Sequence, residues 1–165
     1  MLDLVFKNHT TQKVQNENFF KLILDTGIEA LQIKDKNVEM SLNLVGEEKI
    51  KELNNKYRNK NEVTDVLSFP LLEWDPSPAK RGDKGTLSEE SRLKKHDILP
   101  LGDIFICLPF AVKEAKRQNI SLEKELAWLS VHGFLHLSGY DHEKSSEEKK
   151  KMFDLENKIL KELKY

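Results

Sequence analysis

Three histidines and one glycine at fixed offsets place the strictest demand on how this chain folds. They are His132, His136, Gly139 and His142. On a helix, His132 and His136 stand one turn apart on the same face. Gly139 can adopt a positive φ and turn the chain sharply, so that His142 folds back beside the first two rings. The spacing therefore predicts a helix that ends near Gly139 and a site where three imidazoles bind one metal ion.

The number of protein ligands bears on the kind of metal site. Three ligands leave the fourth tetrahedral position of a zinc ion for water or substrate, as in catalytic sites, whereas a fourth protein ligand would indicate a structural site. Metzincin proteases share the spacing, but there a glutamate follows the first histidine and acts as the general base. Gly133 stands at that position here, so the peptidase mechanism lacks its proton acceptor. Zinc is the favoured metal. Nickel or another transition metal stays open, because imidazole binds several of them.

Hydrophobic periodicity predicts the fold class. Apolar residues alternate with polar ones in some segments, which is typical of strands, and recur every three or four residues in others, which is typical of helices. The predicted strands are 2–6, 38–44, 65–69 and 103–108, and the predicted helices are 17–33, 46–57, 111–118, 121–139 and 145–163. These segments predict an α+β fold in which a small mixed β-sheet of about four strands is covered by about five helices. The metal site would lie on a buried central helix, and residues 1–165 would form a single metal-dependent domain.

Single residues sharpen some of these boundaries. Pro70 and Pro109 are expected to end the third and fourth strands. Tyr57 is expected to point inward, with Ile50 and Leu53, from the second helix. Cys107 is expected to be a buried core residue and not a metal ligand.

Residues 72–99 form the one segment with no regular pattern. It contains prolines, glycines and charges of both signs, and structureless segments of this length in compact domains are usually either functional or disordered. Either a mobile insertion or a flap that touches substrate fits this composition. Trp74, within this segment, and Trp128 are both expected to pack rather than to stack on bases, and Trp74 is the better candidate for stacking on an unpaired base.

Composition limits the partners and the compartment. The formal net charge is −1, from 27 basic and 28 acidic side chains, whereas proteins that coat duplex nucleic acid are usually strongly basic. The single cysteine excludes an intramolecular disulfide, which fits a reducing compartment. No secretory leader and no apolar run long enough for a membrane span is visible. A cytoplasmic protein with no membrane partner is expected.

Three segments together resemble the YbeY family of bacterial endoribonucleases. Residues 132–142 read His-Gly-Phe-Leu-His-Leu-Ser-Gly-Tyr-Asp-His, which looks like the family signature. Residues 53–60, Leu-Asn-Asn-Lys-Tyr-Arg-Asn-Lys, and 64–70, Thr-Asp-Val-Leu-Ser-Phe-Pro, resemble its central block. Residues 101–107, Leu-Gly-Asp-Ile-Phe-Ile-Cys, resemble the next strand. The resemblance runs from about residue 38 to the C-terminus.

The resemblance implies a function and a set of site residues. It implies an α+β fold and one zinc ion held by His132, His136 and His142, which would be catalytic ligands. It also implies hydrolysis of single-stranded RNA, with roles in ribosomal RNA maturation and ribosome quality control, and hence the small ribosomal subunit or assembly factors as partners. Arg58 would line the cleft and contact the substrate, and its planar guanidinium suits a phosphate.

Two points stay open on the sequence alone. Histidine ligands usually donate their second N–H to a carboxylate or a carbonyl, and the candidates for such supporting residues are Asp65, Ser68, Asp103 and Asp141. The alternatives to an endoribonuclease are a metallopeptidase that takes its base from outside the helix and a non-catalytic ribosome-assembly factor whose metal is structural.

Overall fold

A four-stranded mixed sheet organises the protein. The computed structural model describes residues 1–71 and 98–165. The strand order is β1-β2-β4-β3. β1 (Leu2–Asn8) and β4 (Ile98–Cys107) both run parallel to the central β2 (Asn37–Val45), and β3 (Val66–Pro70) is antiparallel to β4. The predicted α+β class and the mixed sheet of four strands are confirmed.

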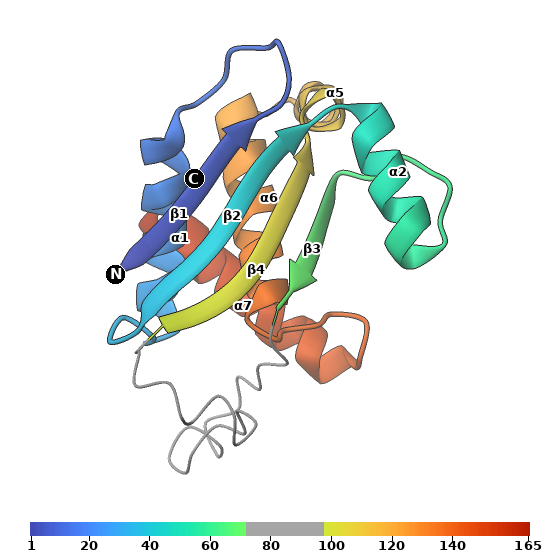
Figure 1. The fold of residues 1–165 in the computed structure, drawn as a ribbon. Helices are drawn as coiled ribbons and strands as arrows, with labels where there is room; N and C mark the ends of the chain where they lie inside the picture. Colours follow the sequence, from blue (N-terminus) through green and yellow to red (C-terminus); the bar gives the residue numbers. More distant parts are fainter. Residues whose placement is uncertain (72–97) are drawn as a thin grey trace.

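The helices cover the two faces of the sheet unequally. α1 (Glu17–Ala30), α6 (Leu122–Leu137) and α7 (Ser146–Glu162) lie together behind the sheet in the view of Figure 1. α2 (Glu47–Arg58) lies beside β3, and α5 (Leu108–Gln118) follows directly after β4. These five helices in the described part of the chain match the predicted number.

α6 is the central helix of the large core. Its side chains are buried on nearly all sides, because it contacts α1, α5, α7, β3 and β4. Phe134 is fully buried and packs against Gly27 of α1, where an added Cβ would lie only 2.8 Å from the ring. Gly27 therefore does not interrupt α1, and its missing side chain makes room for the ring of Phe134.

A smaller core lies on the other face of the sheet, under α2. Its buried members are Val45, Ile50, Leu53, Leu67 and Cys107. Cys107 is fully buried, as the sequence predicts. This cluster attaches α2 to β3 and β4, and it thereby sets the position of Arg58 at the last turn of α2.

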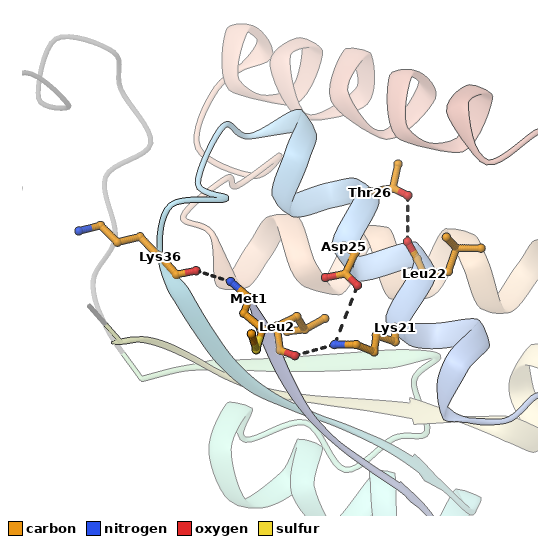
Figure 2. A network of polar contacts seen from close by, with 7 residues as sticks. All are labelled: Met1, Leu2, Lys21, Leu22, Asp25, Thr26 and Lys36. Atoms are coloured by element: carbon orange, nitrogen blue, oxygen red, sulfur yellow. Dashed lines mark hydrogen bonds and ion pairs between the residues drawn. The ribbon is translucent and has the colours of Figure 1, made fainter. Parts of the chain in front are cut away.

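Polar contacts tie the first strand to α1 and to the start of β2. Figure 2 shows the N-terminal amine of Met1 donating to the carbonyl of Lys36 at 2.8 Å. It also shows the Lys21 ammonium reaching the Leu2 carbonyl at 2.6 Å and the Asp25 carboxylate at 3.9 Å. The edge strand β1 is thus held at its beginning by contacts with two other elements.

Two of the predicted boundaries around β4 are wrong. The strand begins at Ile98, not at residue 103, and it pairs with β2 along its whole length despite a register shift between Glu39 and Met40. The sequence does not indicate this pairing, because a glycine usually interrupts a strand. Gly102 adopts φ +134°, and a glycine is required there because an added Cβ would lie 2.1 Å from the Phe69 carbonyl oxygen. The next helix begins at Leu108 and contains Pro109 in its first turn, where the missing N–H of proline carries no cost.

The predicted inward orientation of Tyr57 is also wrong. Its side chain is 56% exposed, and its ring lies 4.9 Å from the ring of Phe69 at the surface. The inward positions of α2 are Ile50, Leu53 and Asn54. Of the predicted irregular segment 72–99, only Ile98 and Leu99 are described, and both belong to β4; Trp74 lies outside the described residues.

Candidate metal centre

The end of α6 turns the chain back as the glycine spacing predicts. α6 ends at Leu137, and Gly139 follows at φ +84°. The Gly139 N–H donates to the His136 carbonyl at 3.0 Å, and the Tyr140 N–H donates to the Leu135 carbonyl at 3.0 Å. This pair of hydrogen bonds is a Schellman motif, which satisfies the last carbonyls of the helix. The reversal brings the segment that carries His142 alongside the last turn of α6.

The three histidine rings converge at this turn. Ligand nitrogens of His132, His136 and His142 all lie within 4.8 Å of one another, and this group could hold a metal ion. The Nε2 atoms of His132 and His136 lie 3.1 Å apart. Two nitrogens bound to one tetrahedral zinc at 2.0–2.1 Å would be separated by roughly 3.3 Å. The donor set therefore fits zinc in its chemistry and in its spacing.

Two residues orient the ring of His132. The Glu156 carboxylate on α7 lies 2.7 Å from Nδ1 of His132, which directs Nε2 toward the other two rings. The indole of Trp128, one turn earlier on α6, stacks on the imidazole with ring centroids 5.0 Å apart. Trp128 is half-buried: it packs partly against the core and also lines the groove described below. A carboxylate on the outer nitrogen is the usual support of a metal-binding histidine.

His136 is held in the state that a metal ion requires. Burial, together with the neighbouring rings of His132 and His142, lowers its pKa from 6.5 to about 4. Asp141 and a backbone hydrogen bond at Tyr140 act in the opposite direction but do not outweigh these causes. At neutral pH the ring is uncharged, and a neutral imidazole is the form that binds metal.

A groove opens in front of the three histidines. Its volume is about 1680 Å³, above the roughly 300–1,000 Å³ of small-molecule pockets. Residues of β3, the end of α6, the turn after it and the first half of α7 line the groove. Arg58 lines it too and is exposed, so α2 and α6, far apart in the sequence, contribute to one cavity.

A buried amide holds the segment that follows Arg58. The Asn54 side chain is 1% exposed and donates to the Glu62 carbonyl at 2.9 Å. Asn59 ends α2 in the left-handed conformation at φ 55°. The main chain around Arg58 is therefore fixed on both sides, while its guanidinium has no ion-pair partner among the described residues.

The supporting residues suggested by the sequence make other contacts. The Asp65 carboxylate accepts from the Val66 N–H, Ser68 donates to the Gly133 carbonyl, and Asp141 accepts from the Glu143 N–H. These three line the groove. Asp103 instead accepts a hydrogen bond from Ser41 on a neighbouring strand.

Glu156 was missed because its sequence context looks ordinary. It lies among charged residues of a long helix, and its side chain is only 9% exposed. The available signal was its position in the inward stripe of α7, between the buried Met152 and Ile159. An acid in such a stripe needs a partner, because an unpaired buried charge is costly.

The structure explains why the position after His132 is a glycine. Gly133 is buried against the sheet, and an added Cβ would lie 3.0 Å from Ile104 and 3.1 Å from the Ser68 hydroxyl. The glutamate of a metzincin would therefore push against Ile104 and Ser68 at this position.

Comparison with known proteins agrees with these features. The family model described as "Endoribonuclease YbeY" matches residues 5–164. The chain belongs to the YbeY family. A relative named Endoribonuclease YbeY from Oenococcus oeni is 39% identical over 162 residues, which cover 97% of this chain and 95% of the relative. One with the same name from Phytoplasma australiense is 42% identical over 156 residues, covering 94% and 92%.

The fold of this YbeY family member also has a solved counterpart. The solution structure of TM1509 from Thermotoga maritima is 26% identical and matches with a TM-score of 0.58, covering 97% of this chain and 88% of that one.

Among residues 1–71 and 98–165, none of the helices combines the length and the hydrophobicity that crossing a bilayer requires.

Proposed function

We propose that this chain is a zinc-dependent endoribonuclease that cleaves single-stranded RNA in ribosomal RNA maturation and ribosome quality control. The observation that carries the proposal is the convergence of three histidine nitrogens within 4.8 Å at the floor of a groove lined by Arg58. Membership of a family whose members are named endoribonucleases supports RNA as the substrate. The partners would be ribosomal RNA and the small ribosomal subunit or its assembly factors.

His132, His136 and His142 would hold the zinc ion. Glu156 keeps the ring of His132 oriented by accepting a hydrogen bond from its Nδ1–H. When bound, zinc would supply a Lewis acid that polarises a phosphoryl oxygen. The three histidines would act as catalytic ligands, and we assign no fourth protein ligand.

Arg58 would bind the phosphate backbone of the substrate. A guanidinium forms paired hydrogen bonds with two phosphate oxygens and stays charged at every physiological pH. Since the side chain is exposed at the groove and fixed only through its backbone, it can adapt to the bound strand. RNA carries its own nucleophile, the 2′-hydroxyl. In the proposed step the 2′-oxygen bonds to phosphorus while the bond from phosphorus to the 5′-oxygen breaks; water takes the 2′-hydroxyl proton and supplies one to the leaving 5′-oxygen. No protein side chain is assigned as general base.

The deciding experiment measures metal content by mass spectrometry and cleavage of single-stranded RNA on the same samples. Wild type should contain one zinc per chain and cut RNA, and His136→Ala should lose both. His9→Ala is the matched control, because His9 lies outside the groove. If wild type contains metal but does not cut RNA, a structural role of the metal in an assembly factor replaces the proposal. Nickel in place of zinc would correct only the metal.

A further inference from the structure

The first half of α7 forms a wall of the groove that the proposed chemistry does not use. Lys149, Lys150 and Phe153 all line the groove, as does Glu156, which is bonded to His132. On a helix, residues separated by three, four or seven positions share one face. Phe153 therefore stands one turn before Glu156, and the two lysines stand one turn before Phe153. This wall begins directly beside the histidine cluster.

Phe153 is an unusual residue for such a position. Its side chain is 60% exposed, while the preceding Met152 is 1% exposed in the core. The other exposed aromatic side chains in the described part of the chain, Tyr57 and Tyr165, do not line the groove. A large apolar ring without a polar atom, exposed inside a groove, gains free energy when a flat apolar surface covers it.

The three lysines in the first half of this helix divide into two kinds. Lys151 is held by ion pairs with Glu147 at 3.0 Å and Glu148 at 2.9 Å, and it does not line the groove. Lys149 and Lys150 line the groove and have no ion pair with any residue that the structure describes. Their charges are available to an anionic ligand.

No carboxylate of the groove forms an ion pair with Lys149 or Lys150 in the part of the chain that the structure describes. The Glu156 carboxylate is taken up by His132, and Asp65 and Asp141 accept hydrogen bonds from the backbone N–H groups of Val66 and Glu143. Glu143 is the remaining acid of the groove. The side of the groove formed by α7 therefore combines an exposed aromatic ring with two free cations.

We propose that this wall is a subsite for single-stranded RNA, in which Phe153 stacks on an unpaired base and Lys149 and Lys150 bind the adjacent phosphates. Aromatic rings beside cations are the arrangement with which proteins bind single strands without sequence preference. In a duplex each base is covered by its neighbours, so its face is not offered to the ring. Phe153 thus contributes to the preference for single strands. The subsite rests on the proposed function, because it assigns the groove to RNA.

The first test measures binding to a short unstructured RNA and to its duplex form, with the zinc-loaded full chain. Phe153→Ala should raise Kd and KM for the single strand by about 5- to 150-fold, the effect expected for one stacked base. Phe153→Trp should bind like wild type, and Phe153→Leu should bind like the alanine variant, because leucine keeps the apolar contact but lacks the flat ring. Zinc content should be unchanged in all three variants.

The second test measures the dependence of binding on salt. Log K falls as log salt rises, and each phosphate contact that is lost with a single strand makes this negative slope shallower by about 0.7. Lys149→Gln combined with Lys150→Gln should therefore make the slope shallower by about 1.4, and Lys151→Gln, the matched control, should leave it unchanged. An unchanged slope in the double variant, or an equal loss in the control, would overturn the role of the two lysines.

The outcomes separate the subsite from the proposed function. If wild type binds and cuts RNA but Phe153→Ala or Phe153→Leu binds equally well, the stacking role is wrong while the function stands. If wild type neither binds nor cuts RNA, the function and the subsite are both wrong.

Discussion

The Oε1 atom of Glu156 lies 2.7 Å from Nδ1 of His132, so a carboxylate of α7 supports a candidate metal ligand of α6. Both side chains are largely removed from water, with exposed fractions of 9% for Glu156 and 15% for His132. The contact fixes which nitrogen of His132 is left for a metal ion. It also makes the position of α7 part of the metal centre, because a shift of the helix would release the ring.

Glu156→Gln should weaken zinc binding by about 10- to 100-fold, the usual effect of losing a supporting carboxylate. The amide keeps the shape of the side chain but removes the charge that makes the imidazole a stronger ligand. Affinity would be measured by competition with a chelator of known zinc affinity. Glu143→Gln is the control, because it removes a carboxylate of the same groove whose side chain forms no hydrogen bond or ion pair with a histidine among the described residues. Equal affinities of Glu156→Gln and wild type would contradict the role of Glu156.

Arg58→Ala should lower kcat/KM for RNA by about 10- to 150-fold, as expected for one charged hydrogen-bonded contact of about 1.5–3 kcal/mol. Arg58→Lys should recover only part of the loss, because an ammonium cannot form the paired contact. Zinc content and the midpoint of urea unfolding should stay as in wild type, since the side chain is exposed. Lys60→Ala, an exposed cation just outside the groove, is the control. Full activity of Arg58→Ala would remove Arg58 from the substrate site.

Gly133→Glu should not create a peptidase and should destabilise the fold by more than about 3 kcal/mol, because it buries a charge against Ile104. Gly133→Ala should cost about 1–2 kcal/mol, since the contacts of 3.0 and 3.1 Å force small shifts while alanine favours the helix. Urea unfolding measures both changes. A Gly133→Ala variant more stable than wild type would show that the sheet yields easily at this point.

Gly139→Ala should destabilise the protein by about 1–2 kcal/mol, because the left-handed conformation at φ +84° is strained for a residue with a Cβ. It should also weaken zinc binding, since His142 reaches the other rings through this turn. Gly139→Asn should be milder in both respects, because asparagine tolerates this conformation better. Unfolding and chelator competition on the same variants would check the two effects. If Gly139→Ala lowered the stability but bound zinc as tightly as wild type, the turn at Gly139 would have no role in the metal centre.

The local part of the candidate site could be predicted from the sequence because its spacings are local. His132, His136, Gly139 and His142 lie within one helix turn and one chain reversal, so the helical period and the freedom of glycine are enough to bring the rings together. The four strands and five helices were predictable for the same reason, since hydrophobic periodicity is a local signal. The beginning of β4 was not, because proline and glycine, here Pro100 and Gly102, usually interrupt strands, and the close approach of β3 that requires Gly102 is a tertiary contact.

Only the tertiary structure decided which residues surround the histidines. Glu156 is 24 positions from His132, and no local pattern says which helix face meets which ring. Arg58 was expected in the cleft only through the family resemblance, and what holds it at the groove is the small core under α2. Asp103 and Ser68 show the complementary case, in which plausible neighbours in the sequence turn to other partners. The sequence alone thus determined the metal-binding pattern, whose geometry follows from backbone periodicity, whereas long-range packing of α2, α6 and α7 decided the groove and its supporting carboxylate.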